Sequence, residues 1–180
     1  MNEKDVQEFI DILRTFDTAM LVTQRGRELR SRPMAIADRT EDGRVWFVSS
    51  IDSAKLDELT ENPDVNVAMQ EGLRFLSISG AARATRDRDR INELWNDAYS
   101  VYFSEGPNDP TLVLLEIVPT YVEYWDRSGI EGIKFMFASA KSAVTGETLD
   151  DESEGVHAKI DFPKTTDAAE DRARRGDGTT

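Results

Sequence analysis

The stretch WFVSSIDSAKL at residues 46–56 places small hydroxyls and one cation at a junction between two elements. Its apolar run predicts a strand that ends at Ser49 and Ser50, and the run from Ser53 predicts the start of a helix. The first helical turn, which carries Lys55, has free N–H groups and a positive dipole end. Hydroxyls, amides and an ammonium together could bind a phosphate. The same residues also fit an ordinary strand–turn–helix junction with a solvated lysine.

A second group of polar side chains lies in RELRSRPMA, residues 27–35. Arg30 and Arg32 are two positions apart, so in a strand both point to one face, while Ser31 and Pro33 point to the other. Two guanidinium groups on one face require anions or solvent. An exposed polar edge meets that requirement, so this segment alone does not define a site.

The position of these groups depends on a succession of strands. Hydrophobic alternation between turn signals, such as the Asp-Gly pair at 42–43, indicates six strands. Pro33 has no N–H to donate, so its strand is expected to be an edge or to carry a bulge there. Mostly antiparallel strands with short helices between them predict a mainly β fold, a β-barrel with flanking helices. The predicted strands span residues 18–24, 29–38, 45–50, 65–69, 73–85 and 111–126.

Helical periodicity accounts for much of the remaining chain. At 180 residues the chain is long enough for one domain, which we expect over residues 1–146. Residues 147–162 form an acidic extension, and residues 163–180, with almost no large apolar side chains, are expected to be a disordered tail. The predicted helices span residues 3–15, 53–62, 86–99 and 130–146.

Composition argues against several classes of protein. The chain has no cysteine, which rules out disulfides, zinc–thiolate sites and thiol nucleophiles. His157 is the single histidine, so no histidine-rich metal site and no histidine-based triad is expected. The net charge of −13 predicts that the protein binds neither nucleic acid nor a membrane. An acidic, amphipathic N-terminus and the lack of a membrane-length apolar run predict a cytoplasmic location.

Several segments, in their order and spacing, resemble the flavin-binding split barrel of the pyridoxamine 5'-phosphate oxidase superfamily. They are RSRPMAI (30–36), DGRVWFVSSIDSAKLDELTENPDVNVAM (42–69) and FLSISGAARATRD (75–87). Two later parts, GPNDPTLVLLEIVPTYVEYWD (106–126) and the run KSAVTGE to HAKIDF (141–162), resemble the general stress protein 26 branch of that superfamily.

The resemblance implies an FMN-binding split β-barrel that forms a homodimer, with the flavin at the subunit interface. Arg32 and Lys55 would lie at the FMN phosphate, and the serines of the opening stretch would surround it. The backbone from Pro33 to Ala37 would pass the isoalloxazine ring, and the partner subunit would contribute Trp125. FMN is expected rather than FAD or a deazaflavin. The cofactor-binding residues that the resemblance implies are Arg32, Pro33, Met34, Phe47, Val48, Ser49, Ser50, Ser53, Lys55 and Trp125.

The sequence departs from the founding oxidase of the superfamily where that enzyme binds its substrate. Ala37 stands where the oxidase has a substrate lysine, and Ala54 replaces the arginine beside Lys55. Glu93 and Asp97 fall near the positions of a substrate tyrosine and arginine, so a second phosphate would meet acids. We therefore expect that this protein does not oxidise pyridoxamine phosphate.

Two functions remain open. In the first, the protein is a flavin-dependent oxidoreductase, in which the flavin carries the redox chemistry and the protein positions it. No residue stands out as an acid–base catalyst, which fits chemistry that resides in a cofactor. In the second, it is a non-catalytic flavin-binding or flavin-storing stress protein.

Overall fold

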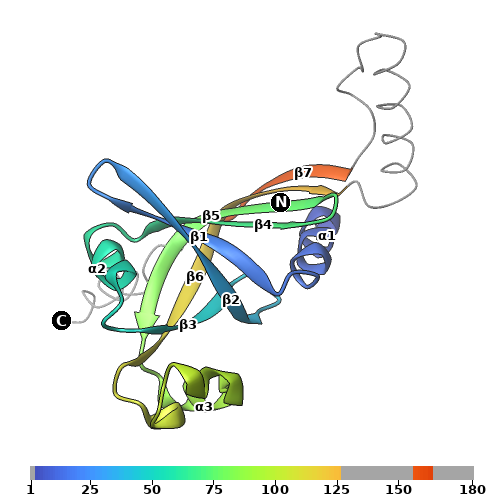
Figure 1. Ribbon diagram of the computed structural model, residues 1–180. Helices are drawn as coiled ribbons and strands as arrows, with labels where there is room; N and C mark the ends of the chain where they lie inside the picture. The colour runs from blue at the N-terminus through green and yellow to red at the C-terminus, as the bar shows by residue number, and fades with distance from the viewer. Residues whose placement is uncertain (1–2, 127–155, 164–180) are drawn as a thin grey trace, which may run out of the picture.

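Antiparallel strands form a closed barrel in the computed structural model, which describes residues 3–126 and 156–163 (Figure 1). The strand order is β3-β2-β1-β4-β5-β6-β7, and a further pairing of β3 with β6 closes the first six strands into a ring. The predicted mainly β barrel and its six strands are therefore confirmed. The strands are β1 (Thr18–Arg25), β2 (Glu28–Arg39), β3 (Val45–Ser50), β4 (Asp64–Glu71), β5 (Arg74–Thr85), β6 (Leu112–Asp126) and β7 (Val156–Asp161).

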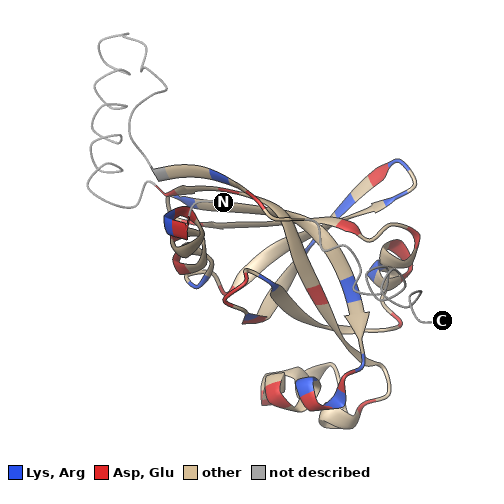
Figure 2. Cartoon of the chain, turned by 180° about the vertical axis from the view of Figure 1, so that it is seen from behind, with Lys and Arg blue, Asp and Glu red and all other residues tan. Residues whose placement is uncertain are grey.

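Side chains alternate between the two faces of the strands, as the sequence pattern predicts. Inward residues such as Leu21, Phe47, Val67 and Ile78 are fully buried and form one continuous core. Most outward residues are partly exposed, but Leu112 and Leu114 of β6 are buried in a second cluster. Charged residues are frequent along the helices and the β1–β2 hairpin, whereas most of the length of the strands is uncharged (Figure 2).

Strand β6 pairs with β5 along one edge and, in succession, with two different strands along the other edge. Its first half, Leu112–Ile117, pairs with β3, and its second half, Tyr121–Asp126, pairs with β7. The two halves meet where the register with β5 shifts between Ser79 and Gly80, opposite Pro119. A Cβ atom on Gly80 would lie 2.2 Å from the carbonyl oxygen of Val118, so the backbones approach each other closely there.

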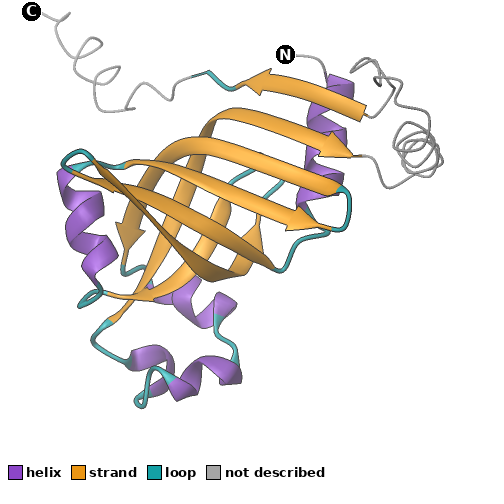
Figure 3. Ribbon diagram, turned by 45° about the horizontal axis from the view of Figure 1, so that its top comes forward, coloured by secondary structure: helices purple, strands orange, loops and turns teal. Residues whose placement is uncertain are grey.

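The three α-helices of the described residues lie at separate places around the barrel (Figure 3). Helix α1 (Glu3–Leu13) covers one end, where Phe9 meets Phe162 edge-to-face with ring centroids 6.0 Å apart. The Tyr124 hydroxyl of β6 also contacts α1, at 3.2 Å from a carboxylate oxygen of Glu8. Helix α2 (Ala54–Glu61) follows β3 and packs against β1. Helix α3 (Arg88–Leu94) follows β5.

The single helix predicted over 86–99 is wrong, because the chain forms α3 and then a separate 3₁₀ turn, Asp97–Val101. The Asp87 side chain caps α3 by accepting from the N–H groups of Asp89 and Arg90. Asn96 then caps the next turn by accepting from the N–H of Ala98. A side chain that accepts from nearby backbone N–H groups competes with continuation of the helix, and here it starts a new turn.

A second, smaller core attaches this helical segment to the barrel. It consists of Ile91, Phe103, Leu112 and Leu114, with Trp46, Val48, Leu94, Trp95 and Tyr99 packed against it. Arg90 adds a polar tether, since its guanidinium lies 5.2 Å from the centroid of the Trp46 ring and is ion-paired with Asp38. The segment after α3 is thereby held beside β3 and β6.

Two further expectations have clear outcomes. Pro33 lies in the part of β2 that pairs with β1 alone, because pairing with β3 starts at Ile36, so the expected edge position is confirmed. The sequence did not predict β7, which lies within the acidic extension. The predicted helix at 130–146 and most of the predicted tail lie outside the described residues.

Gly80 gives a test of the β5–β6 contact. We expect Gly80→Ala to lower the free energy of unfolding by about 3 kcal/mol, because the added methyl would overlap backbone atoms that cannot move without breaking the bulge. Gly26 is the control, since no atom lies near its Cβ position. An alanine there should lower the free energy of unfolding by about 1 kcal/mol, because its φ of 59° is positive. Urea unfolding measures both. Equal losses would show that the contact at Gly80 relaxes freely.

Candidate functional site

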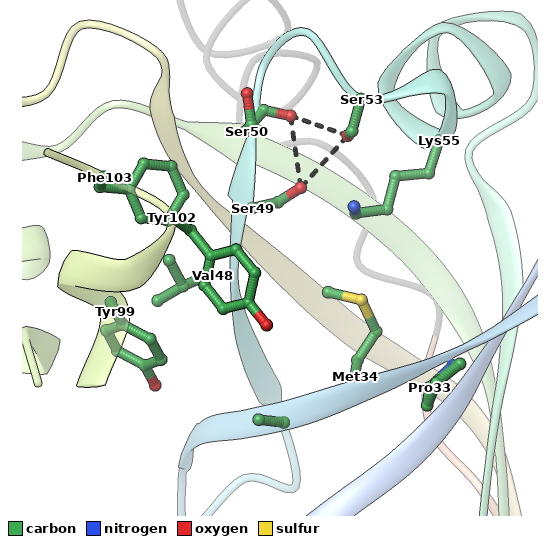
Figure 4. A pocket seen from close by; sticks show the side chains of 11 residues that line it. Pro33, Met34, Val48, Ser49, Ser50, Ser53, Lys55, Tyr99, Tyr102 and Phe103 are labelled. Carbon is green, nitrogen blue, oxygen red and sulfur yellow. Dashed lines mark hydrogen bonds between the residues drawn. The ribbon is translucent and has the colours of Figure 1, made fainter.

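A cavity of about 420 Å³ lies between the end of β3, the start of α2 and the segment after α3 (Figure 4). One wall carries a cation and hydroxyls, and the other is aromatic. Its volume falls within the range of cavities that hold small ligands, roughly 300–1,000 Å³. Its lining residues are Pro33, Met34, Ala35, Val48, Ser49, Ser50, Ser53, Lys55, Tyr99, Tyr102 and Phe103.

The polar wall is built by the turn that joins β3 to α2. The Ser53 hydroxyl donates to the carbonyl oxygen of Ser50 at 2.7 Å, and the hydroxyl oxygens of Ser49 and Ser53 are 3.3 Å apart. Ser53 is the N-cap residue of α2, but its side chain makes no capping hydrogen bond. The N–H groups of the first turn therefore donate to no capping side chain. That of Leu56 donates to the carbonyl oxygen of Ser53 at 2.9 Å, and those of Ala54 and Lys55 are available to an anion.

Lys55 reaches into the cavity, with its ammonium pointing toward the space between Ser49 and Met34 (Figure 4). Burial, and after it the positive charge of Arg32, lower the pKa of Lys55, while Glu58 acts in the opposite direction. Among the described residues Lys55 makes no hydrogen bond and no ion pair. A half-buried cation without a partner is costly, and a bound anion would remove that cost.

Arg32 lies next to this site but is bound to the protein. Its guanidinium donates to Glu58 at 2.7 Å and to the Thr23 hydroxyl at 2.5 Å. Arg30 also contacts Glu58, at 3.1 Å, which confirms that the two arginines share a face of β2. Burial would raise the pKa of Glu58, but its hydrogen bonds from Thr23, Arg32 and Arg30 outweigh burial and lower it.

The aromatic wall was not predicted. Tyr99, Tyr102 and Phe103 come from the 3₁₀ turn after α3 and the residues that follow it. Phe103 is buried in the small second core, whereas Tyr102 is 81% exposed at the cavity rim. Three aromatic residues within five positions were a signal in the sequence, but only the packing of this segment on β3 brings them opposite Lys55.

Two predicted site residues have side chains elsewhere in this subunit. Phe47 is fully buried in the barrel core, on the opposite face of β3 from Val48. Trp125 lies at the far end of β6 from the cavity, where its ring stacks on His157 with centroids 5.1 Å apart. Its assignment to the partner's site therefore stays a prediction. Glu93 and Asp97, expected at the substrate end, do not line the cavity.

Other kinds of site have no support in residues 3–126 and 156–163. No group of three or more acidic or histidine side chains in these ranges is arranged to hold a metal ion. None of the helices described there has both the length and the hydropathy to cross a bilayer. The cavity is thus the feature that an account of function must explain.

The donors of the cavity suit an organic phosphate that carries an aromatic ring. An ammonium, serine hydroxyls and the start of a helix are groups that bind phosphate. Met34, Val48 and the aromatic residues offer apolar surface to a ring. The only ionisable side chains among the described lining residues are Lys55, Tyr99 and Tyr102, so the cavity contains no carboxylate or imidazole to act as a general base.

The fold and the cavity together define a six-stranded barrel with a pocket at its rim that is lined by a lysine, serine hydroxyls and aromatic side chains. The sequence matches the family described as "Pyridoxamine 5'-phosphate oxidase like" over residues 4–150, and the chain belongs to this family. The predicted split-barrel fold is therefore confirmed, as is the likeness to general stress protein 26.

Three relatives illustrate that likeness. General stress protein 26 of Bacillus subtilis is 27% identical over 154 residues, which are 82% of this chain and 99% of the relative. The crystal structure of general stress protein 26 from Bacillus anthracis has 25% identity and a TM-score of 0.60, and the match covers 66% of this chain and 92% of the other. The general stress FMN/FAD binding protein of Xanthomonas citri has 27% identity and a TM-score of 0.60, with coverages of 69% and 89%.

Substitution of Lys55 tests how much its partly buried charge destabilises the ligand-free protein. Its folded pKa lies below its unfolded value, so the unfolded state binds the proton more tightly and protonation of Lys55 weakens the fold at neutral pH. We expect Lys55→Met to raise the free energy of unfolding of the ligand-free protein by about 0.5–2 kcal/mol at pH 7. Urea unfolding should show this gain shrinking as the pH rises through the lowered pKa toward 10.5.

Lys159 is the control for this substitution. Its ammonium lies 3.3 Å from Glu123, and that partner raises its pKa, so its charge favours the folded state. Lys159→Met should therefore not stabilise the protein. A gain of the same size in both variants would mean that methionine stabilises through its apolar surface and that burial of the Lys55 charge is not the cause.

Proposed function

We propose that this protein binds FMN in the cavity, with the phosphate at Lys55 and the start of α2. The observation that carries the proposal is the partly buried Lys55 ammonium, which has no partner in the described chain and faces hydroxyls and a helix start. The apolar residues of β2 and the aromatic wall suit the isoalloxazine ring. A relative whose name includes FMN/FAD binding supports the choice of a flavin.

Comparison of FMN with riboflavin tests this assignment. Both carry the same ring system, but only FMN carries the phosphate. We expect stoichiometric FMN binding in a fluorescence titration, and Lys55→Ala should weaken it by about 1.5–3 kcal/mol, roughly ten- to a hundredfold. The affinity for riboflavin should hardly change. Equal losses for both ligands, or no loss for either, would place the phosphate elsewhere.

The flavin site lies at the interface of a homodimer. The outer face of β2, β1, β4 and β5 carries two rows of uncharged residues in register, although 32% of the chain is charged. Next to the cavity, Val101 and Tyr102 are both 81% exposed. An uncharged face beside an aromatic rim is typical of a surface that a second subunit covers. The two rows are Ser31, Val22, Asn66 and Ser79, and Pro33, Met20, Ala68 and Ser77.

A charge placed in the middle of this face should separate the subunits. We expect the wild-type protein to be a dimer in light scattering and Ala68→Glu to be a monomer with weaker flavin binding, because a buried carboxylate would have no partner at the interface. Gln7→Glu adds the same charge on the exposed surface of α1 and should leave the dimer intact. A monomeric wild-type protein that binds FMN would contradict the dimer.

With FMN bound, the protein acts as a flavin-dependent oxidoreductase, and the flavin supplies the redox chemistry. The lining residues hold and orient the cofactor. Apart from Lys55, no cation among the described lining residues is available to a second phosphate, so pyridoxamine phosphate is not the substrate. Turnover with NADH or NADPH tests this step. A tightly bound flavin that these donors reduce only slowly would favour flavin storage instead.

A further inference from the structure

Glu58 is a buried carboxylate that the cavity itself does not use. It lies on α2, one helical turn after Lys55, and its side chain is 2% exposed. Three groups donate to it: the Thr23 hydroxyl at 2.5 Å, Arg32 at 2.7 Å and Arg30 at 3.1 Å. A buried carboxylate that accepts from three groups is ionised and fixed in position, and its partners are fixed with it.

Arg32 is the partner that Glu58 constrains most. One terminal nitrogen donates to Glu58 and the other to Thr23, whose hydroxyl in turn donates to Glu58. A guanidinium group has five N–H donors, so these two bonds leave most of its donors free. The charge of Arg32 lies close enough to Lys55 to lower the pKa of that lysine. The two cations thus lie near each other, and Arg32 is held in place by Thr23 of β1 and Glu58 of α2.

The charges of this cluster leave an excess of positive charge, which favours the binding of a phosphate monoester. Arg30, Arg32 and Lys55 contribute three positive charges, and Glu58 and Glu28, which also contacts Arg30 at 3.2 Å, contribute two negative charges, which leaves one positive charge. A phosphate monoester carries a charge of about −1.5 to −2 at neutral pH. Without Glu58, Arg32 would keep its hydrogen bond to Thr23 but lose its bond to a carboxylate, and the neighbouring cations would repel one another.

We propose that Glu58 is a positioning residue, which holds the guanidinium of Arg32 beside Lys55 so that both cations contact one phosphate group. This inference rests on the proposed function, since the phosphate is that of FMN. It gives Glu58 a role that its own charge opposes, because a carboxylate near a phosphate would on its own weaken binding. The two effects have opposite signs and can be separated.

Glu58→Gln tests the proposal through the sign of its effect. Glutamine offers one acceptor oxygen, and its NH₂ group faces a donor, so Arg32 loses part of its support. The cluster gains one unit of positive charge. If position matters, FMN binding to the full-length protein should weaken about tenfold in spite of that gain, and riboflavin binding should stay unchanged. If only charge matters, FMN binding should become tighter, and this result would overturn the proposal.

Two further variants complete the test. Arg30→Gln removes a cation but leaves both anchors of Arg32, so it should weaken FMN binding less than Glu58→Gln does. Thr23→Val removes one anchor without changing any charge, so it should weaken FMN binding and spare riboflavin. Thr23→Val also keeps the proposal testable if Glu58→Gln fails to fold.

The remaining outcomes are also decisive. Equal losses of FMN and riboflavin affinity in Glu58→Gln, or no change in either, would overturn the positioning role and leave the FMN site in place. A wild-type protein that binds FMN no more tightly than riboflavin would overturn the phosphate site itself, and the positioning role with it. The wild-type measurement therefore distinguishes failure of the proposed function from failure of this inference.

Discussion

The pairing of β3 with β6 is the constraint on which the rest of the structure depends. It closes the barrel, and its last pair, Ser50 with Leu112, fixes where β3 ends. The same half of β6 supplies Leu112 and Leu114 to the small core that holds the segment after α3. One set of backbone hydrogen bonds therefore sets both walls of the cavity: the serines that precede α2, and the aromatic residues opposite them. The kink at Gly80 and Pro119 allows β6 to do this and still take β7 at its other end.

The cavity concentrates positive charge in a chain whose net charge is −13. This arrangement disfavours the charged form of Lys55, which is partly desolvated and lies near a second cation. Glu58 offsets part of this effect from inside the protein, where it also satisfies Thr23 and Arg30. Stability and ligand binding thus make opposite demands on the same few side chains, as is common at functional sites.

Patterns within short stretches of the sequence were enough to predict most of the helices and strands. The six strands, α1 and α2, and the polar junction from Ser49 to Lys55 follow from alternation, turn residues and capping preferences. The break after Leu94 was missed because hydrophobic spacing runs through it, whereas the caps at Asp87 and Asn96 act on single turns. Strand β7 is short, lies in an acidic stretch and depends on β6 for its pairing. The Arg32–Glu58 contact joins residues 26 positions apart, so no local pattern could predict it.

The contact between Phe9 and Phe162 has a consequence for the two ends of the described chain. Helix α1 and the residue that follows β7 cover each other, and β7 pairs with a single strand. The docking of β7 orders its backbone, and the burial of Ile160 has to outweigh that loss of conformational entropy. The first helix and the last strand should therefore open together as one cooperative unit, at a lower free energy than the barrel. Amide hydrogen exchange would detect that unit as a shared, intermediate protection of residues that lie at opposite ends of the sequence.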